Sequence, residues 1–113
     1  MELFEKYLKE AEELHEKGDL PQAGEKYYGA ISELIKMIGE RTKWEHKGHR
    51  ARREIILKLD EKYPELNLWT LHGSAERLHQ NFYENDLTIE GFEKDVKNVK
   101  LLISYLKEIL ERL

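Results

Sequence analysis

The sequence predicts an all-α fold, an antiparallel up-down bundle of five helices that forms one domain over residues 1–113. Apolar residues recur at spacings of three and four in five segments, which is the spacing of a buried helix face. No segment shows the alternation of apolar and polar residues that marks a half-buried strand. The length allows one domain with a single modest core, and the 37% of charged residues suit helical surfaces.

The first two segments predict a helical hairpin. A helix over residues 2–17 ends at Gly18, since glycine is the usual residue just past a helix C-terminus. Asp19 is placed to cap the next helix, and Pro21 suits its first turn, where the missing N–H group costs nothing. This second helix runs to about Ile38, and the short turn makes the pair antiparallel.

The third and fifth helices have equally plain boundaries. We expect a loop or a frayed helix end from Gly39 to Gly48, followed by a helix from Arg50 to Lys62. Pro64 ends that helix, because the residue before a proline is disfavoured in helical conformation. Thr88 carries a capping signature and opens the fifth helix, the longest and most apolar, which continues to the C-terminus.

The fourth helix, LWTLHGSAERLHQNFY over residues 68–83, carries two stripes of side chains. We expect Asn67 to cap it and residues 84–86 to end it. The first stripe is apolar and predicts a core face: Leu68, Leu71, Ala75, Leu78 and Phe82. The second has the same spacing but lies roughly 90° away and is aromatic and ionisable: Trp69, His72, Glu76, His79 and Tyr83.

The second stripe predicts a functional face, because a solvated helix face is not expected to be aromatic and ionisable in this pattern. One interpretation is a contact between two copies of the chain, since aromatic residues are favoured at interface centres. The other is a ligand pocket between subunits, which Tyr27 or Tyr28 from the second helix completes. There the imidazoles and Glu76 act as acid–base groups or hydrogen-bond to the ligand. Both interpretations imply a homodimer.

A basic segment, residues 41–53, is the second candidate site. It holds six Lys or Arg residues against one Glu, so its net charge is +5 while the whole chain carries −4. Cations beside an aromatic residue, here Trp44, suit phosphate contact with base stacking. The residues predicted to bind phosphate are Lys43, Lys47, Arg50, Arg52 and Arg53. The alternative is a solvated segment whose cations balance the acidic helices.

Metal, cofactor and membrane motifs are missing. Glu76-x-x-His79 resembles half of a di-iron motif, and Glu12-x-x-His15 is the only partner half, but Glu12 falls at the flank of its helix. We therefore predict no metal site, and without a Gly-rich phosphate loop or any cysteine we predict no cofactor. No apolar run approaches the ~18 residues that span a bilayer, so we expect a cytoplasmic protein without a membrane partner.

Two parts of the sequence resemble the archaeal PaREP family, which is grouped with the HEPN-like helical bundles. The matching residues are Ala11, Leu14, Gly18-Asp19, Gln22-Ala23, Lys26-Tyr27-Tyr28 and Ala30, then Trp69, Ala75 and the segment LHQNFYE at 78–84. The resemblance covers nearly the whole chain, and LHQNFYE is its most specific part. It implies a dimeric helical bundle. Relatives bind nucleotides or RNA, some are ribonucleases of toxin systems, and some pair with a small nucleotidyltransferase.

The ribonuclease relatives carry an Arg followed by a His four to six residues later, near the end of the bundle. Arg41 and His46 have this spacing and are the catalytic candidates, although they fall between the second and third helices. The leading expectation is an RNA- or nucleotide-binding module, as one component of a two-component system with a nucleotidyltransferase. The alternatives are a dimeric interaction protein without catalysis and, third, a metal-independent ribonuclease.

Overall fold

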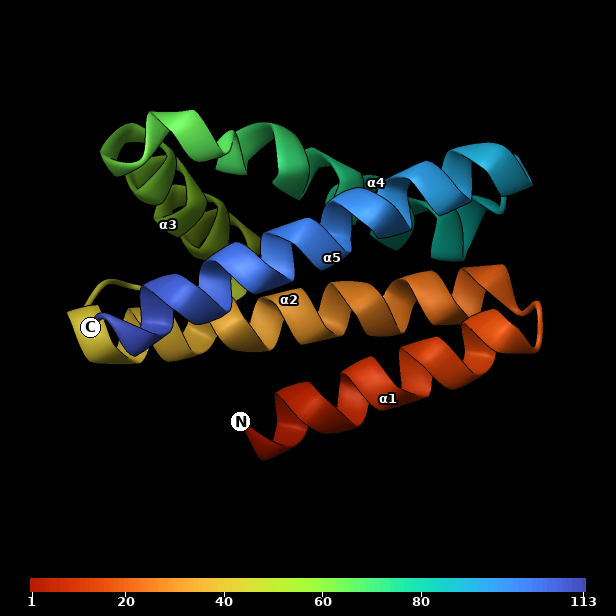
Figure 1. Cartoon of the computed structure of the whole chain (residues 1–113), viewed down its shortest axis with the longest axis horizontal. Coiled ribbons are helices and arrows are strands. Elements are labelled where there is room, and N and C mark those ends of the chain that lie inside the picture. The colour runs from red at the N-terminus through yellow and green to blue at the C-terminus, as the bar shows by residue number, and fades with distance from the viewer.

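A computed structural model describes all 113 residues and contains helices but no strands (Figure 1). The α-helices are α1 (Glu2–Glu16), α2 (Leu20–Thr42), α3 (Gly48–Lys62), α4 (Leu68–Glu84) and α5 (Ile89–Glu111). A short 3-10 turn, η1 (Pro64–Leu66), joins α3 to α4. The predicted all-α fold with five helices is confirmed. None of these helices is both long enough and apolar enough to span a bilayer.

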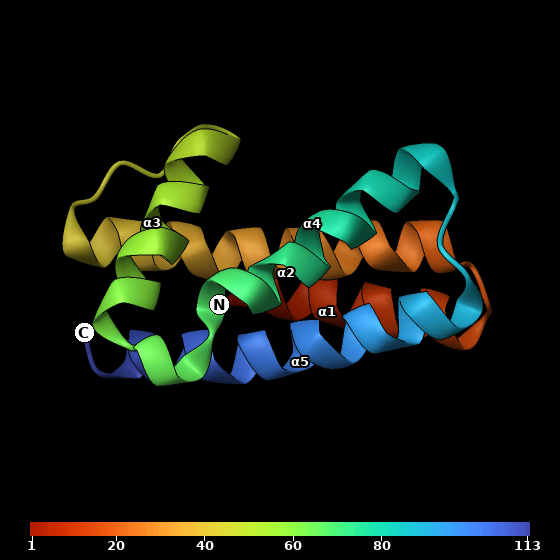
Figure 2. The same ribbon diagram turned by 90° about the horizontal axis from the view of Figure 1, so that it is seen from above.

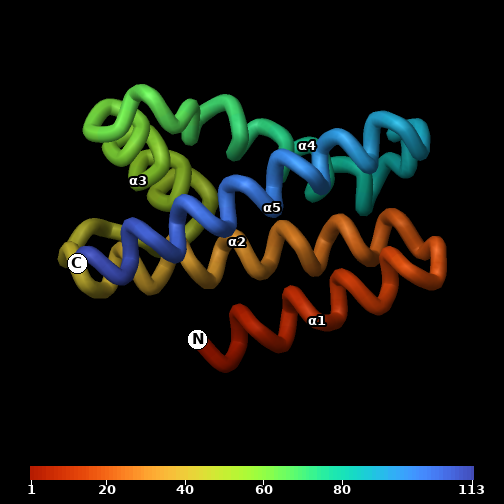
Figure 3. Tube along the Cα trace, in the orientation of Figure 1, coloured from red at the N-terminus to blue at the C-terminus, as the bar shows by residue number.

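Helix α2 is the centre of the bundle and contacts each of the other α-helices. Along the chain, α1, α2, α4 and α5 alternate in direction, as the tube shows (Figure 3). Helix α3 instead crosses α2 steeply near the C-terminal end of α2 (Figure 2). The up-down order is thus carried by four helices, and α3 bridges α2 and α4 at one end. This crossing brings the start of α3 beside the second stripe of α4.

The core is one cluster of 25 buried apolar residues drawn from all five helices. Tyr27 and Phe92 are buried completely in it, and burial of such a side chain contributes roughly 1.5–3 kcal/mol. Gly24 lets α2 and α4 approach closely, because a Cβ atom there would lie 3.3 Å from both the Cβ and the carbonyl oxygen of Leu78. Sequence positions spaced by three and four therefore form the core as predicted.

Two of the three predicted capping residues act as caps. The Asp19 side chain accepts a hydrogen bond from the Gln22 N–H at 3.4 Å, and Thr88 Oγ1 accepts one from Gly91 at 3.0 Å. Asn67 stands at the start of α4 but makes no side-chain cap, because its backbone is left-handed (φ 54°) rather than extended as a cap requires. Asp60 replaces it and accepts a hydrogen bond from the Trp69 N–H at 3.2 Å.

Helix α2 continues to Thr42, about one turn beyond the predicted end at Ile38. Gly39 does not stop the helix; a Cβ there would lie 2.6 Å from the Cβ of His46, so the glycine makes room for the returning loop. The helix ends instead at Lys43, whose backbone is left-handed (φ 67°). Within residues 39–48, for which a loop or a frayed helix end is predicted, only residues 43–47 lie outside the helices.

The first stripe of α4 is core except at its end. Leu68, Leu71, Ala75 and Leu78 are buried, whereas Phe82 is 37% exposed. The reason is visible in Figure 2, where the C-terminal end of α4 diverges from α5.

Candidate functional site

The second stripe of α4 is covered in the middle by the chain itself and open at its ends. His72 is 5% exposed, and Glu76 and His79 are half-buried, because α2 and α3 pack beside them. Trp69 and Tyr83, at opposite ends of the stripe, are 48% and 71% exposed. The stripe is therefore divided into an internal polar part and two exposed aromatic residues.

Three aromatic side chains from three helices meet beside this stripe. The ring of His79 stacks on that of Tyr28, with centroids 4.3 Å apart and planes at 18°. The ring of His49, from the first turn of α3, lies 5.1 Å from His79 and 5.7 Å from Tyr28. We call Tyr28, His49 and His79 the ring cluster. His79 is held in place by Glu25 of α2, whose Oε1 lies 2.8 Å from its Nδ1.

The ring cluster forms part of a surface groove of about 390 Å³. Helix α2 provides most of the lining, and α1, α3 and α4 provide the remainder. Beside the ring cluster and Glu25, its polar lining residues are Tyr7, Lys26, Ser32, Glu33, Lys36 and Arg52. Gly29 lies between these, and a Cβ there would be 3.3 Å from the ring of Tyr7, so the glycine lets α1 approach.

Most charges in the groove are already paired within the chain. Lys36 binds Glu33 at 3.0 Å, and Lys26 binds Glu10 at 3.1 Å. Arg52 forms no ion pair or hydrogen bond within the chain. The groove thus presents one unpaired cation next to an exposed imidazole, that of His49.

The electrostatics of the ring cluster follow from burial and from the cations of α3. Partial desolvation beside the neighbouring rings lowers the pKa of the exposed His49, and the neighbouring charges of Arg52 and His79 lower it further. His49 is therefore neutral at pH 7 in the ligand-free protein. Burial raises the pKa of Tyr28, and the carboxylate of Glu76 adds to this effect, so Tyr28 keeps its proton.

A second polar group lies deeper between α3 and α4. Arg53 Nε donates a hydrogen bond to Oε1 of Glu76. Burial would raise the pKa of Glu76, but the hydrogen bond from Arg53 and the nearby His72 and Arg53 charges lower it below its usual value. Burial lowers the pKa of His72 to about 4 despite the attraction of Glu76.

The predicted phosphate-binding residues do not form one surface. Arg52 lines the groove, whereas Arg53 is bound to Glu76. Lys47 and Arg50 line a separate depression with Glu45 and Glu54, because positions three and four apart share a helix face. The fifth residue, Lys43, ends α2.

Arg41 and His46, the catalytic candidates, are each bound to the backbone. Arg41 Nη1 donates to the Leu110 carbonyl at 2.8 Å, which joins the C-terminal end of α2 to that of α5. Nδ1 of His46 lies 2.9 Å from the Trp44 carbonyl oxygen. No hydrogen bond joins the two side chains, and this arrangement favours structural roles for both.

Tyr27 lies away from the groove, so only Tyr28 of the two adjacent tyrosines joins the predicted face. The Tyr27 hydroxyl lies 3.0 Å from Nδ1 of His15, and Nε2 of that histidine lies 2.7 Å from Glu93. Burial raises the pKa of Tyr27 to about 12, and Glu12 and Glu93 contribute. This chain of contacts joins α1, α2 and α5. No three His, Asp or Glu side chains are arranged to hold a metal ion.

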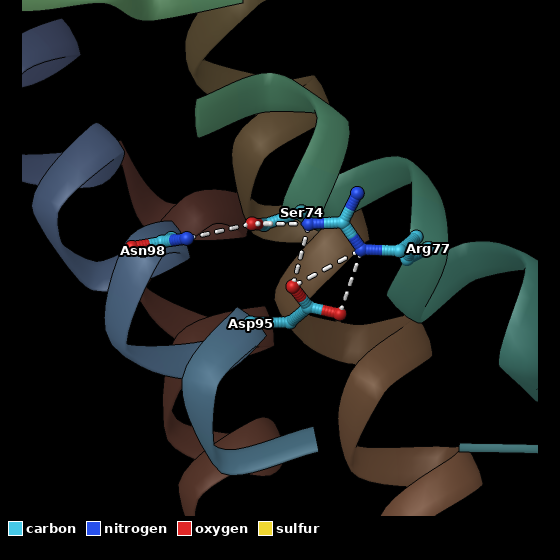
Figure 4. Close-up of polar contacts among 4 residues, drawn as sticks. All are labelled: Ser74, Arg77, Asp95 and Asn98. Carbon is cyan, nitrogen blue, oxygen red and sulfur yellow. Dashed lines mark hydrogen bonds and ion pairs between the residues drawn. The ribbon is translucent and has the colours of Figure 1, made fainter. Parts of the chain in front are cut away.

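A polar junction fixes α4 against α5 (Figure 4). Arg77 donates to Oδ1 of Asp95 at 2.8 Å through Nη2 and to Oδ2 at 3.1 Å through Nε. Ser74 Oγ lies 3.0 Å from Arg77 Nη2 and accepts a hydrogen bond from Asn98 at 2.9 Å. Because Ser74 and Asp95 are buried, the junction sets the rotation of α4 and hence the direction of its second stripe.

Sequence reasoning placed His49 in the basic segment without assigning it a role, and it did not identify Glu25. His49 lies three residues before Arg52, and this spacing on one helix face was the available signal. Glu25 had no comparable signal, because its role depends on how α2 faces α4.

Comparison with known proteins gives one family and one similar solved structure. Residues 1–103 match the archaeal PaREP1/PaREP8 family. A crystal structure of a protein from Sulfolobus solfataricus has a TM-score of 0.79 and 29% sequence identity, over 95% of this chain and 96% of that chain. No curated protein matches the sequence.

Proposed function

The chain belongs to the archaeal PaREP1/PaREP8 family, and we propose that it is an RNA- or nucleotide-binding module whose ligand occupies the groove beside the ring cluster. The HEPN-like resemblance, whose relatives bind nucleotides or RNA, is consistent with this function. The site itself is argued from the residues of this chain.

One observation carries the proposal: a stacked cluster of aromatic rings adjoins an unpaired arginine in one groove. Aromatic and imidazole faces accept bases by stacking, which is worth roughly 1–3 kcal/mol per base. A guanidinium forms two parallel hydrogen bonds with a phosphate. Both chemistries line the same groove, and a nucleotide unit needs both.

The test is binding of a fluorescent RNA oligonucleotide, measured by anisotropy at several salt concentrations. Arg52→Gln is expected to weaken binding and to reduce the salt dependence by about one phosphate contact. The matched control is Lys9→Gln, which removes the same charge from an exposed position on α1. Equal effects of the two variants, or no RNA and no nucleotide binding by the wild-type chain, would contradict the proposal.

A second candidate function, subunit contact, is favoured by the exposed aromatic residues of α4. Trp69, Phe82 and Tyr83 are 48%, 37% and 71% exposed, which suits a contact surface in a homodimer. Trp69→Ser is expected to shift a dimer to monomer in sedimentation experiments. Leu3→Ser, an exposed apolar residue on α1, is the control and is expected to leave the oligomeric state unchanged. A wild-type chain that sediments as a monomer would exclude this function.

A small nucleotidyltransferase is the proposed protein partner, and this follows from the HEPN-like resemblance alone. Co-expression with such an enzyme, followed by purification of the tagged chain, tests it. Recovery of the chain alone would remove this partner from the proposal and leave the groove unaffected.

A further inference from the structure

We propose that Arg52 and His49 together hold a single phosphate group of the ligand and that His49 takes up a proton when the phosphate binds. The inference rests on the proposed function, because it assigns the charged part of the ligand to the same groove. It adds that the groove holds one phosphate group and that His49 binds one proton when this group binds.

The register of α3 supports a shared phosphate site. His49 and Arg52 are three residues apart and line the same groove. The half-buried Arg52 has no partner within the chain, and the exposed His49 has no hydrogen bond, so both keep their donors for a ligand. Arg52 offers two parallel N–H donors, and a protonated imidazole offers one more. Together they match the oxygens of one phosphate.

The other charges of the groove limit the ligand to one phosphate. The remaining cations, Lys26 and Lys36, are paired with Glu10 and Glu33. The other lining carboxylate, Glu25, is bound to His79. A second phosphate along the groove would meet these carboxylates without a spare cation. A nucleoside monophosphate therefore fits this charge pattern better than a triphosphate.

Protonation of His49 depends on the groups that face it from each neighbouring element. The closest groups are Arg52 and Arg53 of α3, Glu76 and His79 of α4, and Tyr28 of α2. Farther along the groove lie Glu25, Lys26, Glu33 and Lys36 of α2 and Tyr7 of α1. In the ligand-free protein the adjacent cations and partial burial disfavour the imidazolium. A bound dianion reverses the sign of the local charge and favours it. Ligand binding and proton uptake are then coupled.

The experiment titrates inorganic sulfate, because sulfate stays dianionic over the whole range and its pH dependence reports the protein alone. Sulfate affinity is expected to rise as pH falls from 8 to 6, by up to about tenfold per pH unit for one proton. His49→Gln is expected to flatten the pH dependence of sulfate affinity. Arg52→Gln is expected to weaken sulfate binding at every pH but to leave the pH dependence unchanged. His46→Gln, a histidine outside the groove, is the control and is expected to behave like the wild type.

A second measurement needs no variant in the site. The histidine ring resonances, followed by NMR against pH, are expected to show a rise in the pKa of His49 when sulfate is added. In parallel, adenosine monophosphate is expected to bind at least as tightly as adenosine triphosphate. Each of three results would overturn the inference: an equal pH dependence in His49→Gln, no change in the His49 titration, or a triphosphate that binds tenfold tighter.

The two proposals fail differently. If neither RNA nor adenosine monophosphate binds at any pH, the proposed function fails. If RNA binding is weakened by Arg52→Gln but is unaffected by His49→Gln and by pH, the assignment of a phosphate shared with His49 fails and the binding function stands.

Discussion

Nδ1 of His79 and Oε1 of Glu25 lie 2.8 Å apart, and this contact joins α4 to α2 at the edge of the groove. Both side chains are about one quarter exposed, at 26% and 27%. The contact fixes the direction of the His79 ring, which in turn stacks on Tyr28. The ring cluster is thus positioned by a residue that was not part of the predicted site.

Glu25→Gln is expected to leave the fold nearly as stable and to weaken ligand binding. A contact between two partly exposed polar side chains contributes about 0–1 kcal/mol, so the midpoint of urea unfolding should shift little. Loss of the carboxylate replaces the charged acceptor of His79 Nδ1 by a weaker neutral one, so the His79 ring is held less firmly, and RNA anisotropy measures the consequence. Glu13→Gln, which removes an exposed carboxylate of α1 outside the groove, is the control. Equal binding by the wild type and Glu25→Gln would show that the orientation of His79 is irrelevant.

The helices could be predicted because their signals are local. Apolar spacing, the caps Asp19 and Thr88, and the breaks at Gly18 and Pro64 all act within a few residues. The error in the end of α2 concerns a glycine. Gly39 has the composition of a helix stop but remains helical, and its missing side chain leaves room for the loop residue His46.

The site could be predicted only in part, because the stripe of α4 is a local pattern and its partners are not. His79 and Glu76 follow from the spacing on α4. Their contacts with Glu25 and Arg53 depend on the steep crossing of α3 and the rotation of α2, which no local pattern determines. For the same reason the sequence predicts a single phosphate-binding surface for the basic segment, whereas in the structure Arg50 and Arg52 of α3 lie on different faces of the helix.

Two glycines of α2 are expected to respond oppositely to alanine. Either substitution gains up to about 1 kcal/mol from helix propensity. At Gly24 the new Cβ meets the Cβ and backbone of Leu78, so α4 must move, and overpacking of this kind lowers the free energy of unfolding by about 1 kcal/mol net. At Gly29 it meets only the half-buried ring of Tyr7, which can rotate, so stability rises by about 0.5 kcal/mol.

Urea unfolding of both variants measures the difference, with each serving as the control for the other. A stabilising Gly24→Ala would mean that α2 and α4 are less tightly packed than the 3.3 Å approach indicates.

Stability is expected to fall as pH decreases from 6.5 towards 4, because His72 binds its proton in the unfolded chain before it does so in the folded one. Its pKa is about 4 in the fold against a model-compound value of 6.5, so over this interval the unfolded state holds more protons. The free energy of unfolding therefore drops by about 2 kcal/mol between pH 7 and pH 5 from this residue alone.

His72→Leu removes the titrating group and is expected to reduce the slope of stability against pH in this interval. His46→Gln, at a histidine outside the core, is expected to leave the slope of stability against pH unchanged. Urea unfolding at half-unit pH steps gives both slopes. Identical slopes for the wild type and His72→Leu would show that other groups cause the acid sensitivity.

Arg77→Met is expected to lower the free energy of unfolding by about 2–3 kcal/mol, because it leaves the buried carboxylate of Asp95 without a counter-charge. Asp95→Leu in the Arg77→Met background is expected to restore most of this loss, since an apolar pair of similar volume avoids the desolvation penalty. Urea unfolding of the single and double variants completes the cycle. Near-additive losses, with the double variant less stable than either single one, would show that the junction acts through Ser74 and Asn98 rather than through charge pairing.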